Sequence, residues 1–171
     1  MRQLYLIKHI FGEPDPECLA EIYVDKEIKL NTSIIISLDR IITVLENIQI
    51  KNERIDSLRK IGENTYCIID DNYTDPITGR KISYQIIKKI NLYEHVYEIR
   101  FKSFVSGTVR NCRIFFTFNS KKNSTLWTHG FTKVRSVSDY YGNTANEMTN
   151  FLSGLAEVIY KRIINNSDTQ Y

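Results

Sequence analysis

The chain has 171 residues, of which 42% are hydrophobic, and this is enough for a buried core without disulfide cross-links. Its formal net charge of +3 hides an asymmetry, because residues 1–80 hold ten Lys and Arg against fourteen Asp and Glu, whereas residues 81–135 hold eleven against two. A basic region of this kind predicts a polyanionic partner, and nucleic acid is the first candidate.

The cysteine pattern and the lack of long apolar runs limit the class of protein. Cys18, Cys67 and Cys112 are odd in number, far apart and without CxxC spacing, which argues against a disulfide framework and against a zinc site. No apolar run approaches the roughly 20 residues that a membrane-spanning helix needs, and Lys8 and His9 interrupt the first one before a signal peptide could form. We therefore expect a cytoplasmic protein with no metal, no cofactor and no membrane partner.

The first half of the chain is expected to form one strand and two or three helices. Residues 4–10 alternate as a strand, and residues 17–30 fit either a short helix or a strand. From Thr32 or Ser33, a plausible N-cap, apolar residues recur with helical spacing as far as residue 48 or 49. A second helix is expected at residues 52–61, before Gly62, so that the two form a helical hairpin.

The second half is expected to be mainly strands, followed by a helix. Strands are predicted at residues 65–71, 82–90, 96–102, 112–118 and 124–133. A polar loop is predicted at residues 134–146, and a final helix at residues 144–164. The order predicts an α+β fold with a curved antiparallel sheet, one face of which is covered by the N-terminal helical hairpin and the C-terminal helix.

The last three predicted strands carry most of the unbalanced positive charge. Each alternates apolar and polar residues, so one face should pack inward and the other should be exposed. The side chains expected on the exposed face are Glu98, Arg100, Lys102, Arg113 and His129. Arginine, lysine and histidine together suit the binding of phosphate groups.

Three motifs on these strands resemble consecutive strands of the RelE/HigB superfamily, the toxins of bacterial type II toxin–antitoxin pairs. The motifs are VYEIR at residues 96–100, CRIFF at residues 112–116 and LWTHGFTK at residues 126–133. Their order and spacing are similar to those of the family, in which two helices precede the strands and one helix follows them. The resemblance implies a single RelE-like domain over residues 1–171, with insertions near residues 11–30 and 70–80.

The function that this resemblance implies is a ribosome-dependent endoribonuclease that cuts mRNA and inhibits translation. In such a reaction a ribose 2′-hydroxyl attacks the adjacent phosphodiester, and no metal is needed if the protein supplies an acid, a base and a cation. Arg100 and Arg113 would hold the phosphate, and His129 would be the acid or base, because an unperturbed imidazole titrates near pKa 6.5. For the arginines the alternative is a solvated face with salt bridges to Glu98 or Glu94. Glu98 could be a base or only the partner that orients Arg100, and we favour the second role. For His129 the alternative is a packing role.

Five further residues are candidates for substrate binding. Lys102 and Lys133 could bind phosphate, and Trp127, Tyr140 and Tyr141 could stack on bases. Each has a simpler alternative, since lysines at strand ends are usually solvated, a single Trp usually packs in the core, and the chain has eleven tyrosines.

Three hypotheses about function stay open from the sequence. The first is the endoribonuclease toxin, whose partners would be a cognate antitoxin, the ribosome and mRNA. The second is a non-catalytic toxin on the same scaffold, similar to the gyrase inhibitors of the ParE type. The third is a phage or mobile-element protein that binds nucleic acid or a host protein. A titratable His129 beside two arginines favours the first, because a binding surface needs charge but no proton transfer.

Overall fold

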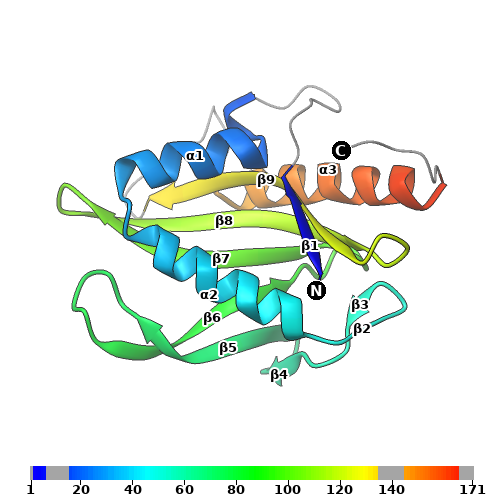
Figure 1. Ribbon diagram of the computed structural model, residues 1–171, viewed down its shortest axis with the longest axis horizontal. Helices are drawn as coiled ribbons and strands as arrows, with labels where there is room; N and C mark the ends of the chain where they lie inside the picture. The colour runs from blue at the N-terminus through cyan, green and yellow to red at the C-terminus, as the bar shows by residue number, and fades with distance from the viewer. Residues whose placement is uncertain (1, 7–15, 135–144, 166–171) are drawn as a thin grey trace.

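The computed structural model describes residues 2–6, 16–134 and 145–165, and a seven-stranded sheet organises them (Figure 1). The helical segments are the 3-10 turn η1 (Pro16–Cys18), α1 (Ala20–Leu30), α2 (Ile34–Asn47) and α3 (Ala145–Asn165). The strands are β1 (Gln3–Leu6), β2 (Ile50–Lys51), β3 (Arg54–Ile55), β4 (Arg59–Ile61), β5 (Thr65–Thr74), β6 (Lys81–Lys89), β7 (Tyr97–Val105), β8 (Thr108–Asn119) and β9 (Ser124–Val134).

The large sheet is mixed, so the predicted antiparallel sheet is wrong. Its strand order is β1-β9-β8-β7-β6-β5-β4, with β2 and β3 in a separate hairpin. The pairs from β4 to β9 are antiparallel, but β1 runs parallel to β9, with Gln3 opposite Ser124. This pairing joins two segments that are distant in the sequence, and local periodicity carries no information about such a contact.

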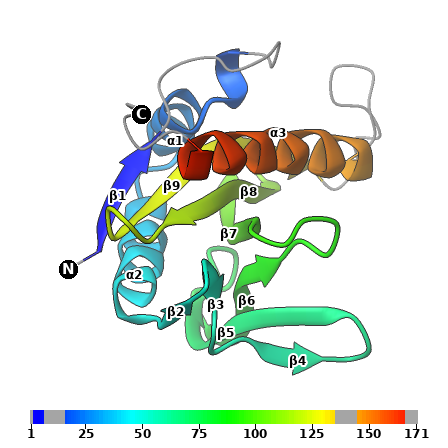
Figure 2. The same cartoon turned by 90° about the vertical axis from the view of Figure 1, so that its right-hand side faces the viewer.

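Helices lie on both faces of the sheet, whereas the sequence predicted helices on one face. The ring of Tyr23 in α1 packs so closely on Gly130 of β9 that a Cβ atom there would lie 2.7 Å from Cε1 of the ring. The next residue, Phe131, belongs instead to a core cluster with Met148 and Leu152 of α3. Successive residues of a strand point to opposite faces, so α1 and α3 cover opposite sides of β9. Figure 2 shows α2 and α3 on opposite sides of the sheet.

The predicted helix at residues 52–61 is also wrong, and with it the helical hairpin. The segment forms most of the short hairpin of β2 and β3, and then β4. Asn52 and Glu53 form its two-residue turn and have φ angles of 53° and 59°. Two left-handed residues in succession are typical of a tight hairpin turn and are incompatible with a helix. Ile55 and Leu58 have helical spacing, but Ile55 is buried as part of β3.

Other predicted elements agree with the structure to within a few residues. The five strands predicted in the second half overlap β5 to β9, and the last predicted helix coincides with α3. The ambiguous residues 17–30 form η1 and α1. The predicted strand at residues 4–10 and the loop at residues 134–146 lie largely outside the described residues. In the described part of the chain, no helix is both long and apolar enough to cross a membrane.

Candidate functional site

Two predicted catalytic residues, Arg100 on β7 and Arg113 on β8, lie directly opposite each other in the sheet. Both guanidinium groups approach one carboxylate, because Oε1 of Glu98 is 3.0 Å from Nε of Arg113 and 3.4 Å from Nε of Arg100. The longer contact is electrostatic only, since Nε of Arg100 is buried and has no hydrogen-bond partner in the described part of the chain. We refer to these three residues as the Arg–Glu–Arg cluster, which holds two positive charges against one negative charge.

The surroundings of Arg100 favour the binding of an anion. Its Nη1 atom donates a hydrogen bond of 2.9 Å to Oε1 of Gln85, and its guanidinium carbon lies 5.9 Å from the centre of the Tyr84 ring. Burial lowers the pKa of Arg100, and the charge of Arg113 lowers it further. An anion beside Arg100 would offset both effects, because an opposite charge stabilises the protonated form.

Two predicted substrate-binding lysines lie in one row across the same strands. Lys102 of β7 is opposite Asn111 of β8, which is in turn opposite Lys133 of β9. The alternation of side chains places this row on the same face as Arg100 and Arg113. Neighbouring strands are about 4.8 Å apart, so the Cα atoms of Lys102 and Lys133 are separated by roughly 10 Å. The structure therefore brings four of the predicted cations onto one face.

The two arginines differ in how deeply their side chains are buried. The side chain of Arg100 is 22% exposed, whereas those of Arg113 and Glu98 are 10% and 8% exposed. Arg113 also donates a hydrogen bond of 3.0 Å to the carbonyl of Cys112. The expectation that Arg113 is exposed is wrong, and in this arrangement Arg100 is the arginine that a ligand can reach.

His129 lies on the same face of the sheet as Arg113, as predicted, but it is not exposed, contrary to the sequence-based expectation. It has 0% exposure, and neither ring nitrogen has a hydrogen-bond partner among the described residues. Burial lowers its pKa to about 4, so the imidazole is neutral at pH 7. His129 lies on the same side of β9 as Phe131, and α3 packs against this strand. A substrate cannot reach an imidazole in this position.

The three predicted stacking residues are not brought to the cluster. Trp127 is 1% exposed and belongs to the main core cluster, which fits the packing role that the sequence left open. Tyr140 and Tyr141 lie outside the described residues. Base stacking by these three side chains therefore gains no support from the described geometry.

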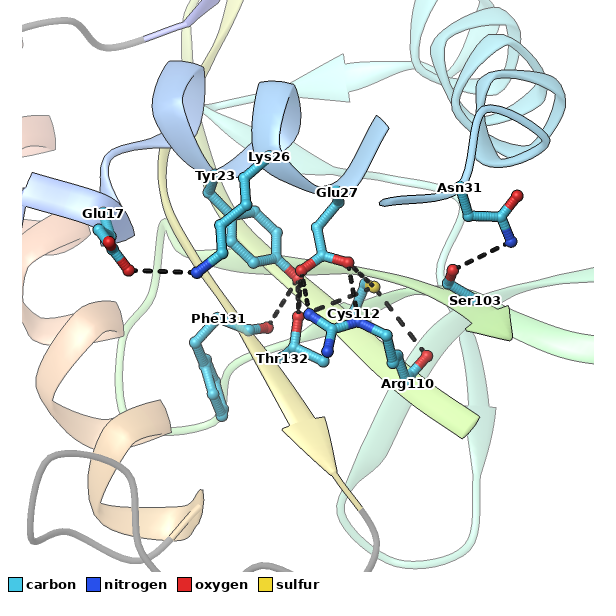
Figure 3. Close-up of polar contacts among 10 residues, drawn as sticks. All are labelled: Glu17, Tyr23, Lys26, Glu27, Asn31, Ser103, Arg110, Cys112, Phe131 and Thr132. Atoms are coloured by element: carbon cyan, nitrogen blue, oxygen red, sulfur yellow. Dashed lines mark hydrogen bonds and ion pairs between the residues drawn. The ribbon is translucent and has the colours of Figure 1, made fainter. Parts of the chain in front are cut away.

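A second polar cluster lies on the opposite face of β8 and β9, and the sequence did not predict it (Figure 3). Glu27 of α1 is 1% exposed, and its carboxylate accepts hydrogen bonds of 3.1 and 2.5 Å from Nε and Nη2 of Arg110. The hydroxyl of Thr132 donates to the same carboxylate at 2.9 Å. Tyr23 lies 2.7 Å from Thr132 and donates a hydrogen bond to the carbonyl of Phe131. The bidentate pair of Glu27 and Arg110, together with the hydrogen bonds of Thr132 and Tyr23, fixes α1 to β8 and β9.

The reactive groups of this second cluster are held in their neutral forms. Burial, together with the Glu27 carboxylate, raises the pKa of Cys112 to about 12. Burial also raises the pKa of Tyr23, and the charges of Cys112 and Glu27 add to the effect. A cavity of about 180 Å³ opens beside these groups. Because the thiolate is the nucleophilic form of cysteine, Cys112 is chemically inert and the cluster is structural.

One signal in the sequence could have revealed Glu27. Ala20, Tyr23 and Glu27 recur with helical spacing, and all three are buried on one face of α1. A carboxylate on the apolar face of a helix needs a cation, since an unpaired buried charge is very costly. The identity of that cation depends on long-range packing, and no local pattern marks Arg110.

No protein-family model, curated protein or solved structure matches this chain. In the described part of the chain, no group of three or more His, Cys, Asp or Glu residues is placed to hold a metal ion.

Removal of the cation that pairs with Glu27 should strongly destabilise the protein. In Arg110→Met the Glu27 carboxylate stays buried without a counter-charge, so we expect a loss of about 3 kcal/mol or more in the free energy of unfolding. The matched control is Lys26→Met, which breaks an exposed ion pair with Glu17 and should cost less than about 1 kcal/mol. Urea unfolding measures both, and similar losses in the two variants would contradict the account of the cluster.

The buried His129 should make the protein less stable in mild acid. Its folded-state pKa of about 4 is below the value near 6.5 expected when it is unfolded, so between these pH values the unfolded state binds more protons. The contribution of His129 to the free energy of unfolding is complete above pH 6.5. It falls by an amount on the order of 3 kcal/mol as the pH drops towards 4.

The variant His129→Leu separates this effect from other titrating groups. At neutral pH its free energy of unfolding should be close to that of the wild type, because the imidazole has no hydrogen-bond partner among the described residues. Between pH 6.5 and 4, its free energy of unfolding should depend much less on pH than that of the wild type. Urea unfolding at several pH values is the measurement. Equal pH dependence in the variant and the wild type would show that His129 is not the group responsible.

Proposed function

We propose that this chain is the toxin of a toxin–antitoxin pair and that it cleaves mRNA on the ribosome without a metal ion. The observation that carries the proposal is the Arg–Glu–Arg cluster, in which arginines of adjacent strands face each other across the sheet. Lys102 and Lys133 add positive charge to the same face. Three accessible cations, Arg100, Lys102 and Lys133, suit a phosphodiester backbone better than a neutral substrate.

The order of the last strands gives further support. The three motifs that resemble RelE/HigB toxins lie on β7, β8 and β9, which are consecutive in sequence and adjacent in the sheet. Helices precede this set of strands, and α3 follows it. The mixed seven-stranded sheet differs from the predicted architecture, so the support comes from this part of the chain alone.

The proposed chemistry assigns separate tasks to the residues of the cluster. Arg100 contacts the phosphate and stabilises the charge that develops on it, while Arg113, more deeply buried, keeps Glu98 in place. Glu98 positions Arg100, as the sequence suggested. Its carboxylate could accept the proton of the attacking 2′-hydroxyl, a task that the buried His129 cannot perform in this conformation. The bond from phosphorus to the 5′ oxygen then breaks and the 5′ oxygen takes a proton from water, which leaves a 2′,3′-cyclic phosphate and a 5′-hydroxyl.

A second candidate function is a toxin that binds RNA without cutting it. The burial of His129 favours this candidate, because it removes the group that best fitted proton transfer near neutral pH. The Arg–Glu–Arg cluster serves either function. The two candidates differ in the state of the message, which is cut in one case and intact in the other.

The partner implied by either candidate is an antitoxin with an acidic segment. Such a segment would neutralise the row of Lys102 and Lys133 and cover Arg100, and this is the direct route to inhibition of a phosphate site.

The test is induced expression of the wild type and of Arg100→Ala in bacteria. We expect the wild type to arrest growth and the variant to be at least a hundredfold slower in cleavage, the usual magnitude for loss of a preorganised charge. Mapping of mRNA 5′ ends in the arrested cells shows whether messages are cut. Arg100 is partly exposed and Glu98 retains Arg113, so the variant should stay folded.

The control is Arg59→Ala, which removes an exposed arginine from β4 at the far edge of the sheet. It should arrest growth as the wild type does. Growth arrest with intact messages would favour the non-catalytic toxin, and normal growth of cells that contain soluble wild-type protein would contradict both candidates.

A further inference from the structure

A cavity of about 360 Å³ lies at the end of the sheet where β8 turns into β9. Three segments that are distant in sequence form its walls: Arg2 beside β1, the turn between β2 and β3, and the turn between β8 and β9. Figure 2 shows these segments at the same end of the molecule. The volume is sufficient for a small ligand.

The backbone around this cavity is held in an unusual conformation. Four described non-glycine residues have a positive φ angle, and three of them line the cavity: Asn52, Glu53 and Asn123, at 53°, 59° and 45°. Glycine is preferred at the second position of such a hairpin turn, so a glutamate there has a conformational cost. The side chain of Glu53 offsets the cost, because its carboxylate accepts hydrogen bonds from the backbone N–H, at 3.1 Å, and the hydroxyl of Ser120.

The walls are rich in hydrogen-bonding groups. Ser124 is 1% exposed, and its hydroxyl is shielded from solvent without a hydrogen-bond partner among the described residues. Such an unsatisfied group is costly unless a ligand or water completes it. The other polar lining residues are Arg2, Asn52, Glu53, Asn119, Ser120 and Asn123.

Two apolar side chains also line the cavity, and its arginine is held by several contacts. Ile50 and Phe118 line it, and the guanidinium carbon of Arg2 lies 5.7 Å from the centre of the Phe118 ring. Arg2 also donates hydrogen bonds of 2.6 and 3.2 Å to the carbonyls of Leu45 and Ile48, which fixes its position. Burial lowers its pKa, so a nearby anion would favour its charged form.

We propose that this cavity binds the ribose of an unpaired RNA nucleotide, with Glu53 and Ser124 as partners of the sugar hydroxyls. Carboxylate, amide and hydroxyl groups in a small cavity suit a compact group with several hydroxyls, and a contact to the 2′-hydroxyl distinguishes RNA from DNA. Exposed lysines in the two turns, Lys51 and Lys121, would contact the adjoining phosphates. The inference rests on the proposed action on RNA and adds a nucleotide subsite to it.

The test is an NMR titration of the isolated protein with ribose 5-phosphate, 2-deoxyribose 5-phosphate and inorganic phosphate. We expect saturable shifts at residues 119–124 with ribose 5-phosphate, and an affinity roughly tenfold lower for the deoxy sugar because one hydrogen bond is lost. Ser124→Val removes the hydroxyl and adds methyl groups to the cavity, so it should weaken binding by a similar factor. Lys121→Glu, an exposed substitution with little risk to the fold, should weaken binding of both sugars.

The matched control is Ser106→Ala, in the turn at the opposite end of β8, and it should bind as the wild type does. Equal affinity for the two sugars, equal affinity for inorganic phosphate, or wild-type binding by Ser124→Val would overturn the inference. The titration uses neither ribosomes nor growth, so its failure is distinguishable from failure of the toxin proposal. A protein that arrests growth but shows no saturable shift overturns the ribose site alone.

Discussion

Strand β8 carries arginine side chains into both faces of the sheet, and each needs a carboxylate from another element. On one face Arg110 pairs with Glu27 of α1, and on the other Arg113 pairs with Glu98 of β7. An unpaired buried charge costs several kcal/mol, so these two pairings restrict how α1 and β7 can be placed on β8. The position of α1 and the pairing of β7 with β8 therefore both depend on β8, through Arg110 and Arg113.

This constraint also determines where positive charge is available. Arg110 and Arg113 are committed to their carboxylates, and the more accessible charge on the face of Arg113 includes Arg100, Lys102 and Lys133. Arg113 holds the Glu98 carboxylate in place, and Glu98 in turn keeps the guanidinium of Arg100 nearby. A ligand would meet an Arg100 side chain that is already positioned, which lowers the cost of ordering it on binding.

The parts of the structure that could be predicted from sequence are those with a strong local period. The alternation in residues 96–102, 112–118 and 124–133 correctly indicates three strands, although residues 112–119 and 124–131 are buried on both faces of the sheet. Alternation assigns a side chain to a face but does not tell which element covers that face. His129 was therefore expected in solvent, whereas it is buried on the side of the sheet where α3 packs.

The failure at residues 52–61 has a different cause. Ile55, Leu58 and Gly62 fit a short helix, and the two-residue turn at Asn52 and Glu53 lacks the glycine that usually marks a hairpin. Contacts with a distant turn, through Ser120, stabilise the unusual conformation. The parallel pairing of β1 with β9 is likewise a long-range contact. The segment at residues 52–61 forms part of the wall of the cavity at the turn between β8 and β9, which therefore could not be found from the sequence.

The central claim is that Arg100 contacts an RNA phosphate, and the salt dependence of RNA affinity tests it most directly. Each phosphate contact on a single strand contributes a slope of about −0.7 to the plot of log affinity against log salt concentration, because a bound cation is released. Fluorescence anisotropy with an unstructured RNA, measured over a range of salt concentrations, gives this slope for the wild type, Arg100→Ala and Arg59→Ala. The account predicts that the slope becomes shallower by roughly 0.7 in Arg100→Ala and is unchanged in Arg59→Ala. Identical slopes and affinities in all three proteins would contradict it.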